Sequence, residues 1–328
     1  MKARPDPAQA VVVSASRTRD LVGRCPDLLA DMIRGRADVR TGRRGAPRRM
    51  RFEEVGALVL WTKHPAGLVS RPLLDALGSY VRSGGLILLQ LTVTGFGGSP
   101  VEPGVPHPED AARALARALD SGIVEPRAVK LRYDPVGSIR FGGSLVYSNA
   151  RLVLLGRVLD LFQPLGVSRV TASELDHVHY PAVTERISSV GGEIVPVSRD
   201  ESISLMRAVS SACRSRGLAF STCVNPYDPD LVDSEGCIDG RVTNSWSRRP
   251  VWDALHNAIG SQRPHCRCTY SLDIGSSPGV THCTTGGSAC LYCYACGPGL
   301  GSAGIEVSRL LEEARRGRDP SWARVAQG

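Results

Sequence analysis

The sequence predicts an α/β protein, a parallel (β/α) barrel of about six to eight units with a C-terminal cysteine-rich segment. Short apolar runs alternate repeatedly with helical segments, which is typical of a parallel sheet with crossover helices. The predicted strands are continuous apolar runs, as expected when both faces of a strand are covered. No glycine-rich phosphate loop follows the first strand, which favours a closed barrel over an open doubly wound sheet.

The predicted elements follow one another in a regular order. The predicted strands are residues 11–15, 55–62, 86–94, 128–133, 167–172, 218–224 and 269–274. The predicted helices are residues 26–34, 68–81, 108–121, 149–162, 201–215 and 303–315. The third helix has the clearest limits, because Pro108 opens it, acidic residues fill its first turn and Gly122 follows it. We therefore expect residues 1–260 to form the barrel and residues 261–328 to form an iron–sulfur segment that completes it.

Polar residues follow the carboxyl ends of five predicted strands. Arg17 and Asp20 follow the first, Lys63 follows the second, and Arg132 and Asp134 close the fourth. The loops at this end of a parallel barrel converge on one pocket, which is where such barrels place their chemistry. Any one of these side chains could simply face water, whereas five strand ends together favour a functional site.

Composition and charge restrict the location and the partners. The longest apolar runs fall far short of the roughly 20 residues that a membrane span needs, and the N-terminus lacks a signal-peptide core. We expect a cytoplasmic protein without a membrane partner. The net charge is +8, and arginines crowd between residues 34 and 51. This segment is either a nucleic-acid contact or a solvated loop, and the absence of interleaved aromatic residues favours the loop.

Six of the ten cysteines are clustered near the C-terminus, at positions 266, 268, 283, 290, 293 and 296. In a cytoplasmic protein such closely spaced cysteines bind metal more often than they form disulfides. Zinc would want four closed ligands, and unligated or disulfide-bonded cysteines are a further alternative. The spacing of Cys283, Cys290 and Cys293 favours iron–sulfur, since three thiolates could hold three irons of a four-iron cluster and leave the fourth open.

Several motifs occur in order along the chain. They are S-A-S-R-T-R-D at 14–20, W-T-K-H-P at 61–65, T-G-F at 94–96, R-Y-D-P at 132–135, C-R-C-T-Y-S-L-D-I-G at 266–275 and C-L-Y-C-Y-A at 290–295. With these motifs, nearly the whole chain resembles the bacterial domain-of-unknown-function family numbered eighteen-forty-eight. Cys223 and the C-I-D motif of Cys237 also match this family. The resemblance implies that these two cysteines, with Cys266 and Cys268, hold a second centre. The spacing from Cys283 to Cys290 is longer here than in the family.

The motif around Cys290 and Cys293 is similar to the cluster loop of radical S-adenosylmethionine enzymes such as those like spore photoproduct lyase. That loop follows the first barrel strand in those enzymes, so its position here implies a circularly permuted barrel. The resemblance implies one or two [4Fe-4S] clusters, of which Cys283, Cys290 and Cys293 hold the one with an open iron. It also implies S-adenosylmethionine as the second cofactor, with Tyr292 near its adenine.

The implied activity is radical chemistry on a small, anionic substrate. Arg17, Lys63 and Arg132 would hold the substrate, with Asp20 or Asp134 orienting them. The expected partners are this small molecule and a reductant such as ferredoxin or flavodoxin. Two alternatives stay open. One is an iron–sulfur redox or Lewis-acid protein that does not use S-adenosylmethionine. The other is a metal-binding module that binds nucleic acid through the arginine-rich segment.

Overall fold

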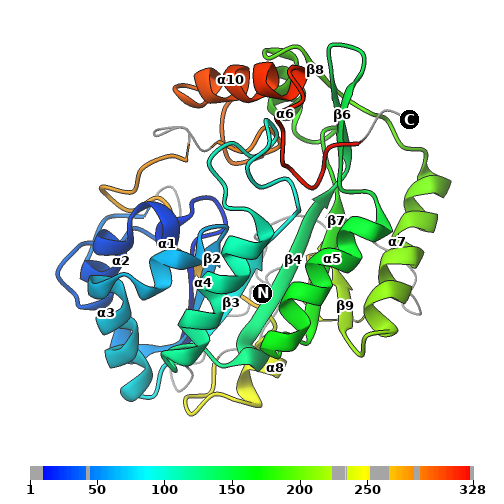
Figure 1. Cartoon of the computed structure of the whole chain (residues 1–328). Helices are drawn as coiled ribbons and strands as arrows, with labels where there is room; N and C mark the ends of the chain where they lie inside the picture. Colours follow the sequence, from blue (N-terminus) through cyan, green and yellow to red (C-terminus); the bar gives the residue numbers. More distant parts are fainter. Residues whose placement is uncertain are drawn as a thin grey trace.

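The chain folds into two sheets of different kinds. The structure, a computed structural model, describes residues 10–41, 45–223, 233, 235–251, 266–283 and 289–325. Within these residues, one sheet has seven parallel strands in the order β10-β1-β2-β3-β4-β7-β9, and the other has three antiparallel strands in the order β6-β5-β8 (Figure 1). The α/β class predicted from the sequence is confirmed.

The parallel strands lie close to their predicted positions. They are β1 (Val11–Ala15), β2 (Val55–Thr62), β3 (Leu86–Thr92), β4 (Val129–Val136), β7 (Arg169–Glu174), β9 (Ala219–Thr222) and β10 (Leu272–Asp273). The last is much shorter than the predicted strand 269–274, and residue 224, at the end of the predicted sixth strand, lies outside the described residues. Helices separate consecutive parallel strands, as the crossover geometry of a parallel sheet requires.

The helices also follow the prediction, with three additions. They are α1 (Leu21–Arg24), α2 (Pro26–Ile33), α3 (Arg71–Arg82), α4 (Pro108–Asp120), α5 (Leu152–Phe162), α6 (Pro181–Ser188), α7 (Arg199–Arg214), α8 (Gly240–Asn244) and α10 (Ala303–Arg315). Short 3-10 helices are η1 (Phe52–Glu54), η2 (Pro65–Val69), η3 (Pro126–Ala128) and η4 (Gln163–Leu165). Helices α1, α6 and α8 have no counterpart in the prediction.

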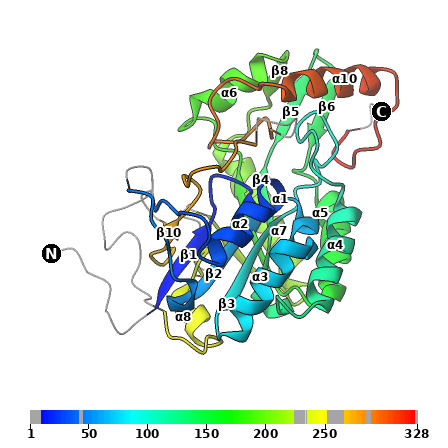
Figure 2. The same ribbon diagram turned by 90° about the vertical axis from the view of Figure 1, so that its left-hand side faces the viewer.

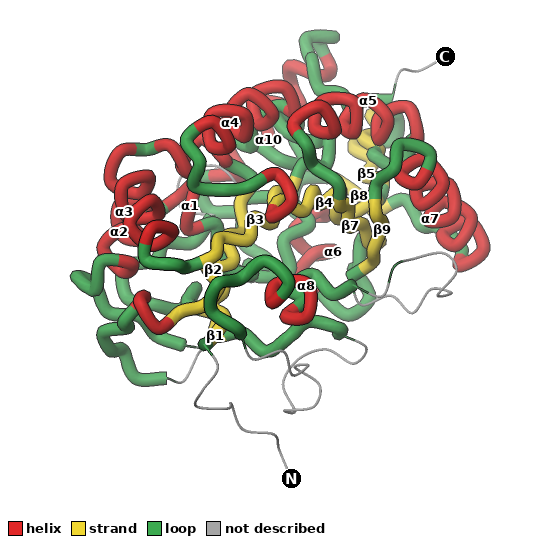
Figure 3. Tube along the Cα trace, turned by 90° about the horizontal axis from the view of Figure 1, so that it is seen from below, coloured by secondary structure: helices red, strands yellow, loops and turns green. Residues whose placement is uncertain are grey.

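The parallel sheet is covered differently on its two faces. Seen along the strands, it curves, with α2, α3, α4, α5 and α7 on its outer face and α8 on the opposite side (Figure 3). The end strands β10 and β9 are not paired with each other within the described residues. The structure therefore confirms the predicted parallel α/β sheet, and its closure into a barrel stays a prediction.

Strand β4 corrects one sequence-based expectation. We expected continuous apolar runs, but β4 alternates, with Lys130, Arg132 and Asp134 on one face and Val129 and Leu131 on the other. The apolar residues belong to the core beneath the outer helices. The polar residues face the inner side, where Lys130 and Arg132 reach the segment that carries Gly236 and Cys237. The inner face of the sheet is therefore able to hold polar groups.

The antiparallel sheet lies beyond the carboxyl ends of the parallel strands (Figures 1 and 2). It consists of β5 (Ser138–Phe141), β6 (Leu145–Ser148) and β8 (Gly192–Ile194), and the sequence analysis did not predict it. This sheet packs with α6, α10 and the cysteine loop at residues 289–292 around a second hydrophobic core that contains Phe141, Tyr147 and Ile187. We call this assembly the cap. The predicted domain boundary at 260/261 lies outside the described residues.

Within the described part of the chain, no helix is both long enough and apolar enough to cross a membrane.

Candidate thiol centres

The cysteines form two separate groups. None of the ten, all of which lie in described residues, forms a disulfide. We define the sheet-side thiol group as Cys223, Cys237, Cys266 and Cys268. We define the loop thiol group as Cys283, Cys290, Cys293 and Cys296. All seven predicted ligands fall into these groups, and Cys296 is the one addition.

The sheet-side thiol group is a chain of hydrogen-bonded sulfurs. The Cys237 sulfur is hydrogen-bonded to both Cys223 and Cys268, and Cys268 is in turn hydrogen-bonded to Cys266. Cys237, Cys266 and Cys268 are buried, and Cys223 is half-buried at the end of β9. Residues that are far apart in the sequence therefore bring four sulfurs together over the inner face of the sheet.

Two arginines accompany these sulfurs, the first of which is buried. Arg132 donates from Nη1 to Cys237 Sγ at 3.1 Å, and its Nη2 binds Asp134. Hydrogen bonds from Cys223 and Cys268, aided by the charge of Arg132, hold the pKa of Cys237 well below its ordinary value, although burial opposes this. The environment therefore favours a thiolate at Cys237.

Arg17 supplies the second guanidinium. Its Nη1 and Nη2 atoms are buried and have no hydrogen-bond partner within the described residues. The guanidinium lies 5.7 Å from the centre of the Trp61 ring and acts electrostatically on Cys266 and Cys268. Asp273 holds the backbone of Arg17 by accepting from its N–H at 2.9 Å. Arg17 is thus a positioned cation whose terminal donors can bind an anion.

Polar side chains of the inner sheet face hold the segment that carries Cys237. Lys130 Nζ donates to the carbonyl oxygen of Gly236 at 2.8 Å and pairs with Glu235 at 2.6 Å. Gln90 Nε2 donates to the carbonyl oxygen of Cys237 at 2.7 Å. A Cβ at position 236 would lie only 2.5 Å from the carbonyl oxygen of Arg267, so the close approach of these two segments requires glycine there.

The loop thiol group lies in the cap. Cys293 Sγ is hydrogen-bonded to Cys296 and to the backbone N–H groups of Ala295 and Cys296, and these bonds lower the pKa of Cys293 to about 6. Burial raises the pKa of Cys290 well above its ordinary value. Cys283 is close enough to Cys290 and Cys293 to interact electrostatically with both. Four sulfurs thus gather here as well, although residues 284–288 lie outside the described part of the chain.

Arg186 of α6 binds the backbone of this loop. Among the described residues it is the largest fully buried side chain, with 0% exposure. Its Nη1 donates to the carbonyl oxygens of Leu291 at 2.9 Å and Cys293 at 2.8 Å. Its Nη2 donates to those of Cys296 at 2.6 Å and Gly297 at 2.5 Å, and its Nε also donates to Gly297 at 3.1 Å. All five N–H donors of the guanidinium are therefore used on one loop.

Lys63 and Tyr292 form a buried polar contact beside the loop thiol group. Lys63 Nζ donates to Glu102 Oε1 and to Tyr292 Oη, both at 2.7 Å, and the Tyr292 hydroxyl also binds Glu102. Burial acts to lower the pKa of Lys63, but the charges of Glu102 and Cys290 outweigh it and raise that pKa. Lys63 thus stays charged while its ammonium is engaged by the protein.

Asp20 organises the ends of two strands. Its carboxylate accepts hydrogen bonds from Gly23 N at 2.8 Å, Thr62 Oγ1 at 3.0 Å and Lys63 N at 2.9 Å, and contacts His64 Nδ1 at 3.1 Å. Burial raises the pKa of Asp20, but the hydrogen bond and charge of His64 outweigh this and lower it. Asp20 therefore holds backbone and a histidine, whereas Asp134 pairs directly with the Arg132 side chain.

The side chains that gather in these groups are thiols. Within the described ranges, no three His, Cys, Asp or Glu side chains are arranged to hold one metal ion. Multi-iron clusters are held by cysteine thiolates. The sheet-side thiol group offers four such sulfurs, together with the partnerless donors of Arg17 that an anionic cluster or substrate would satisfy. The donor set therefore fits an anionic thiolate cluster.

The arginine-rich segment lies apart from these contacts. Arg43 and Arg44 are outside the described residues. Arg49 is exposed and pairs with Asp38 at 3.1 Å.

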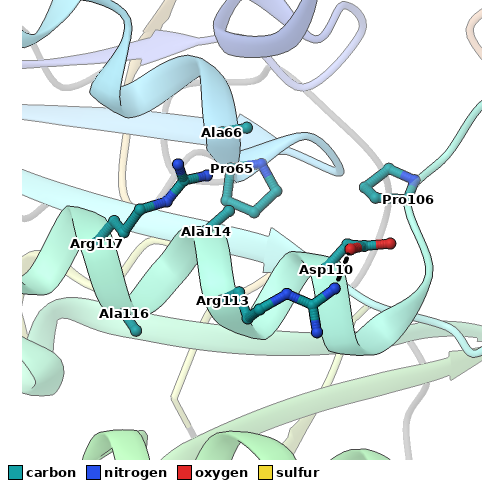
Figure 4. Close-up of a pocket in the computed structure, with 8 residues that line it drawn as sticks. All are labelled: Pro65, Ala66, Pro106, Asp110, Arg113, Ala114, Ala116 and Arg117. Carbon is teal, nitrogen blue, oxygen red and sulfur yellow. Dashed lines mark hydrogen bonds and ion pairs between the residues drawn. The ribbon is translucent and has the colours of Figure 1, made fainter.

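A surface hollow on the outer helical layer also lies apart from the thiol groups, between η2 and α4 (Figure 4). Its lining includes Arg113 and Arg117 but none of the predicted site residues.

Several residues of the site escaped the sequence analysis. Asp273 lies within the motif at 266–275 and Glu102 lies shortly after the motif at 94–96, but the sequence did not indicate which residues they contact. Gln90 lies within an apolar run, where a buried amide is an available signal. Arg186 lies in a segment for which we predicted no element. These residues bind backbone or other side chains across long stretches of sequence.

The fold and the site together define a parallel α/β protein that gathers thiols in two groups, one over the inner face of its sheet and one in the cap. The chain matches the model of the family described as Domain of unknown function (DUF1848) over residues 12–295 and belongs to that family. This confirms the family resemblance seen in the sequence. No curated protein matches the chain.

Proposed function

We propose that this protein is an iron–sulfur enzyme that acts on a small, anionic substrate with S-adenosylmethionine as its second cofactor. The observation that carries the proposal is the gathering of the two thiol groups next to buried cations, with Arg132 3.1 Å from Cys237 and Lys63 beside Cys290. A reduced cluster together with S-adenosylmethionine would supply a radical that removes hydrogen from the substrate.

The loop thiol group is the proposed catalytic cluster site. Cys283, Cys290 and Cys293 would be its ligands, the three thiols that the spacing favours. Tyr292 lies between Cys290 and Cys293 and places its ring 6.3 Å from that of Phe96, which gives the cofactor an aromatic wall. The buried Lys63–Glu102 pair beside it keeps a charged, water-poor surface around the cluster.

Arg17 is the best-supported anion-binding residue of the three predicted. Lys63 is engaged by Glu102 and Tyr292, and Arg132 is engaged by Asp134 and Cys237. Arg17 alone of these three has both terminal nitrogens buried without a partner in the described residues. A carboxylate or phosphate of the substrate would accept both hydrogen bonds in a bidentate arrangement.

The proposal keeps the remaining sequence-based expectations. The sheet-side thiol group would hold a second cluster, and the curved parallel sheet would close as a permuted barrel. The protein would act in the cytoplasm, where thiols stay reduced. A ferredoxin or flavodoxin would deliver the electrons.

Cys296 favours a second candidate function. Its hydrogen bond to Cys293 places a fourth sulfur in the loop thiol group. With four thiolates the cluster would have no open iron, and the protein would act in electron transfer without S-adenosylmethionine.

Anaerobic purification tests both candidates. We expect iron and sulfide in the protein, a change in the electron paramagnetic resonance spectrum of the reduced cluster on adding S-adenosylmethionine, and release of 5′-deoxyadenosine. An unchanged spectrum and intact S-adenosylmethionine with a fully loaded cluster would favour the electron-transfer candidate. Zinc alone, or no metal at all, would contradict both. Cys296→Ala distinguishes the candidates further, because only a four-thiolate cluster requires Cys296.

A further inference from the structure

Arg186 is a buried cation in an unusual setting. It lies on α6, and its five N–H donors all bind backbone carbonyl oxygens of residues 291–297. Within the described residues it makes no ion pair with a carboxylate. Buried charges in proteins are normally paired with an opposite charge or a metal site, because burial without a partner is costly. The carbonyl dipoles satisfy its hydrogen bonds but do not cancel its charge.

The backbone of this loop directs its carbonyl groups and its N–H groups at different partners. Four carbonyl groups, those of Leu291, Cys293, Cys296 and Gly297, point toward the guanidinium. On the other side, the N–H groups of Ala295 and Cys296 donate to the sulfur of Cys293. Successive N–H groups that converge on one point make an anion-binding concavity. The same loop therefore presents oxygens to Arg186 and N–H groups to a ligand sulfur.

The ring contacts support the same arrangement. Tyr180, which precedes α6, packs against Tyr294 with ring centres 5.3 Å apart. The Tyr294 hydroxyl donates to the carbonyl oxygen of Arg17 at 3.1 Å. Helix α6 thus contacts the loop through an aromatic ring and through Arg186, and the loop in turn contacts the end of β1.

We propose that Arg186 is the positioning residue of the loop thiol group. It holds the loop carbonyls on one side, so that the N–H groups of Ala295 and Cys296 face the Cys293 sulfur, and its charge balances an anionic thiolate cluster on the loop. The charge-balancing role rests on the proposed iron–sulfur function, whereas the positioning role concerns the loop itself.

Two variants separate the two roles. Arg186→Gln removes both the charge and most of the donors, while Arg186→Lys keeps the charge but lacks the planar five-donor fork. Arg140→Gln is the matched control, because Arg140 lies on β5 of the same cap and makes only an exposed pair with Glu193 at 2.8 Å.

The first measurement is amide hydrogen exchange of the metal-free proteins. In both Arg186 variants, but not in Arg140→Gln, we expect exchange in residues 291–297 to become about tenfold faster or more, with β2 and β3 unchanged. If the amides of residues 291–297 exchanged at the wild-type rate in both Arg186 variants, the positioning role would be overturned. Should Arg186→Gln fail to fold, Arg186→Lys still decides the question.

The second measurement is the midpoint potential of the loaded cluster by redox-poised electron paramagnetic resonance. A nearby positive charge stabilises the reduced, more negative cluster. We therefore expect a more negative potential in Arg186→Gln and a value near that of wild type in Arg186→Lys. Equal potentials in all three would overturn the charge-balancing role. A wild-type protein without iron would remove the proposed function and this second role together, and the exchange experiment would still decide the first.

Discussion

The two thiol groups have different kinds of support. The sheet-side group lies over the parallel sheet, and from strand β4 Arg132 contacts the Cys237 sulfur directly while Lys130 binds the neighbouring backbone at Gly236. The loop group lies in the cap, where Arg186 contacts the loop backbone rather than the sulfurs. The comparison teaches that a side chain on a strand can reach a thiol directly, whereas Arg186 supports its thiol group only through the loop backbone.

The largest expected effect is the loss of bound iron when one cysteine of either thiol group is replaced. Cys237→Ala and Cys293→Ala should each remove roughly half of the bound iron, because each alters the ligands of one cluster only. Only Cys293→Ala should abolish cleavage of S-adenosylmethionine. Iron and sulfide analysis measures the first effect, and an assay of S-adenosylmethionine cleavage measures the second.

The matched control is Cys213→Ala. Cys213 is buried in α7 and belongs to the main core rather than to either thiol group. The Cys213→Ala variant should therefore retain the iron content of the wild-type protein. Complete loss of iron from each ligand variant would mean that the groups are not independent.

An intermediate effect concerns the Lys63–Glu102 pair beside the loop thiol group, in which Glu102 is buried and Lys63 half-buried. In Glu102→Gln, the ammonium of Lys63 loses its charged partner at 2.7 Å, and we expect a loss of about 3–5 kcal/mol in the free energy of unfolding. Asp110→Asn breaks the exposed pair with Arg113 and should cost about 0–1 kcal/mol. Denaturant titration of both variants gives the difference. Equal losses would show that burial does not strengthen the pair beside Cys290.

The smallest expected effect tests how Tyr292 acts. Tyr292→Phe keeps the ring beside Phe96 but removes the hydroxyl that binds Lys63 and Glu102, so the free energy of unfolding should fall by about 0.5–1.5 kcal/mol. If the ring forms the cofactor wall, the affinity for S-adenosylmethionine should be nearly unchanged. Isothermal titration of the loaded protein measures it, with Tyr147→Phe in the same core as control. A large loss of affinity confined to Tyr292→Phe would assign binding to the hydroxyl.

The sequence predicted the parallel strands because local patterns define them. The run at residues 55–62 coincides with β2, and Pro108 with its acidic neighbours marks the start of α4. Short spacings also place Cys266 near Cys268 and Cys290 near Cys293, whereas the grouping of Cys223 and Cys237 with Cys266 and Cys268 was predicted only from the family resemblance. Strand β4 was placed correctly, but its alternation was missed, since the layer that covers the inner face comes from residues far along the chain.

The cap could not be predicted in the same way. Strand β8 has three residues and pairs with β5 through Ile139 and Ile194, which are far apart in the sequence. Such short strands carry little periodicity and depend on tertiary packing. Arg186 gave no signal, because an arginine in a short helical segment ordinarily faces water. Its role depends on a loop more than a hundred residues later.

The order of the chain has a consequence for maturation. Lys63, Arg132 and Arg186 all precede the cysteines of both groups, and every thiol of these groups lies after β7. Because N-terminal parts of a chain emerge and fold first, the nascent protein presents these cations before any thiol of the two groups. If the proposed clusters are bound, they would therefore be inserted late, into a scaffold that is almost complete.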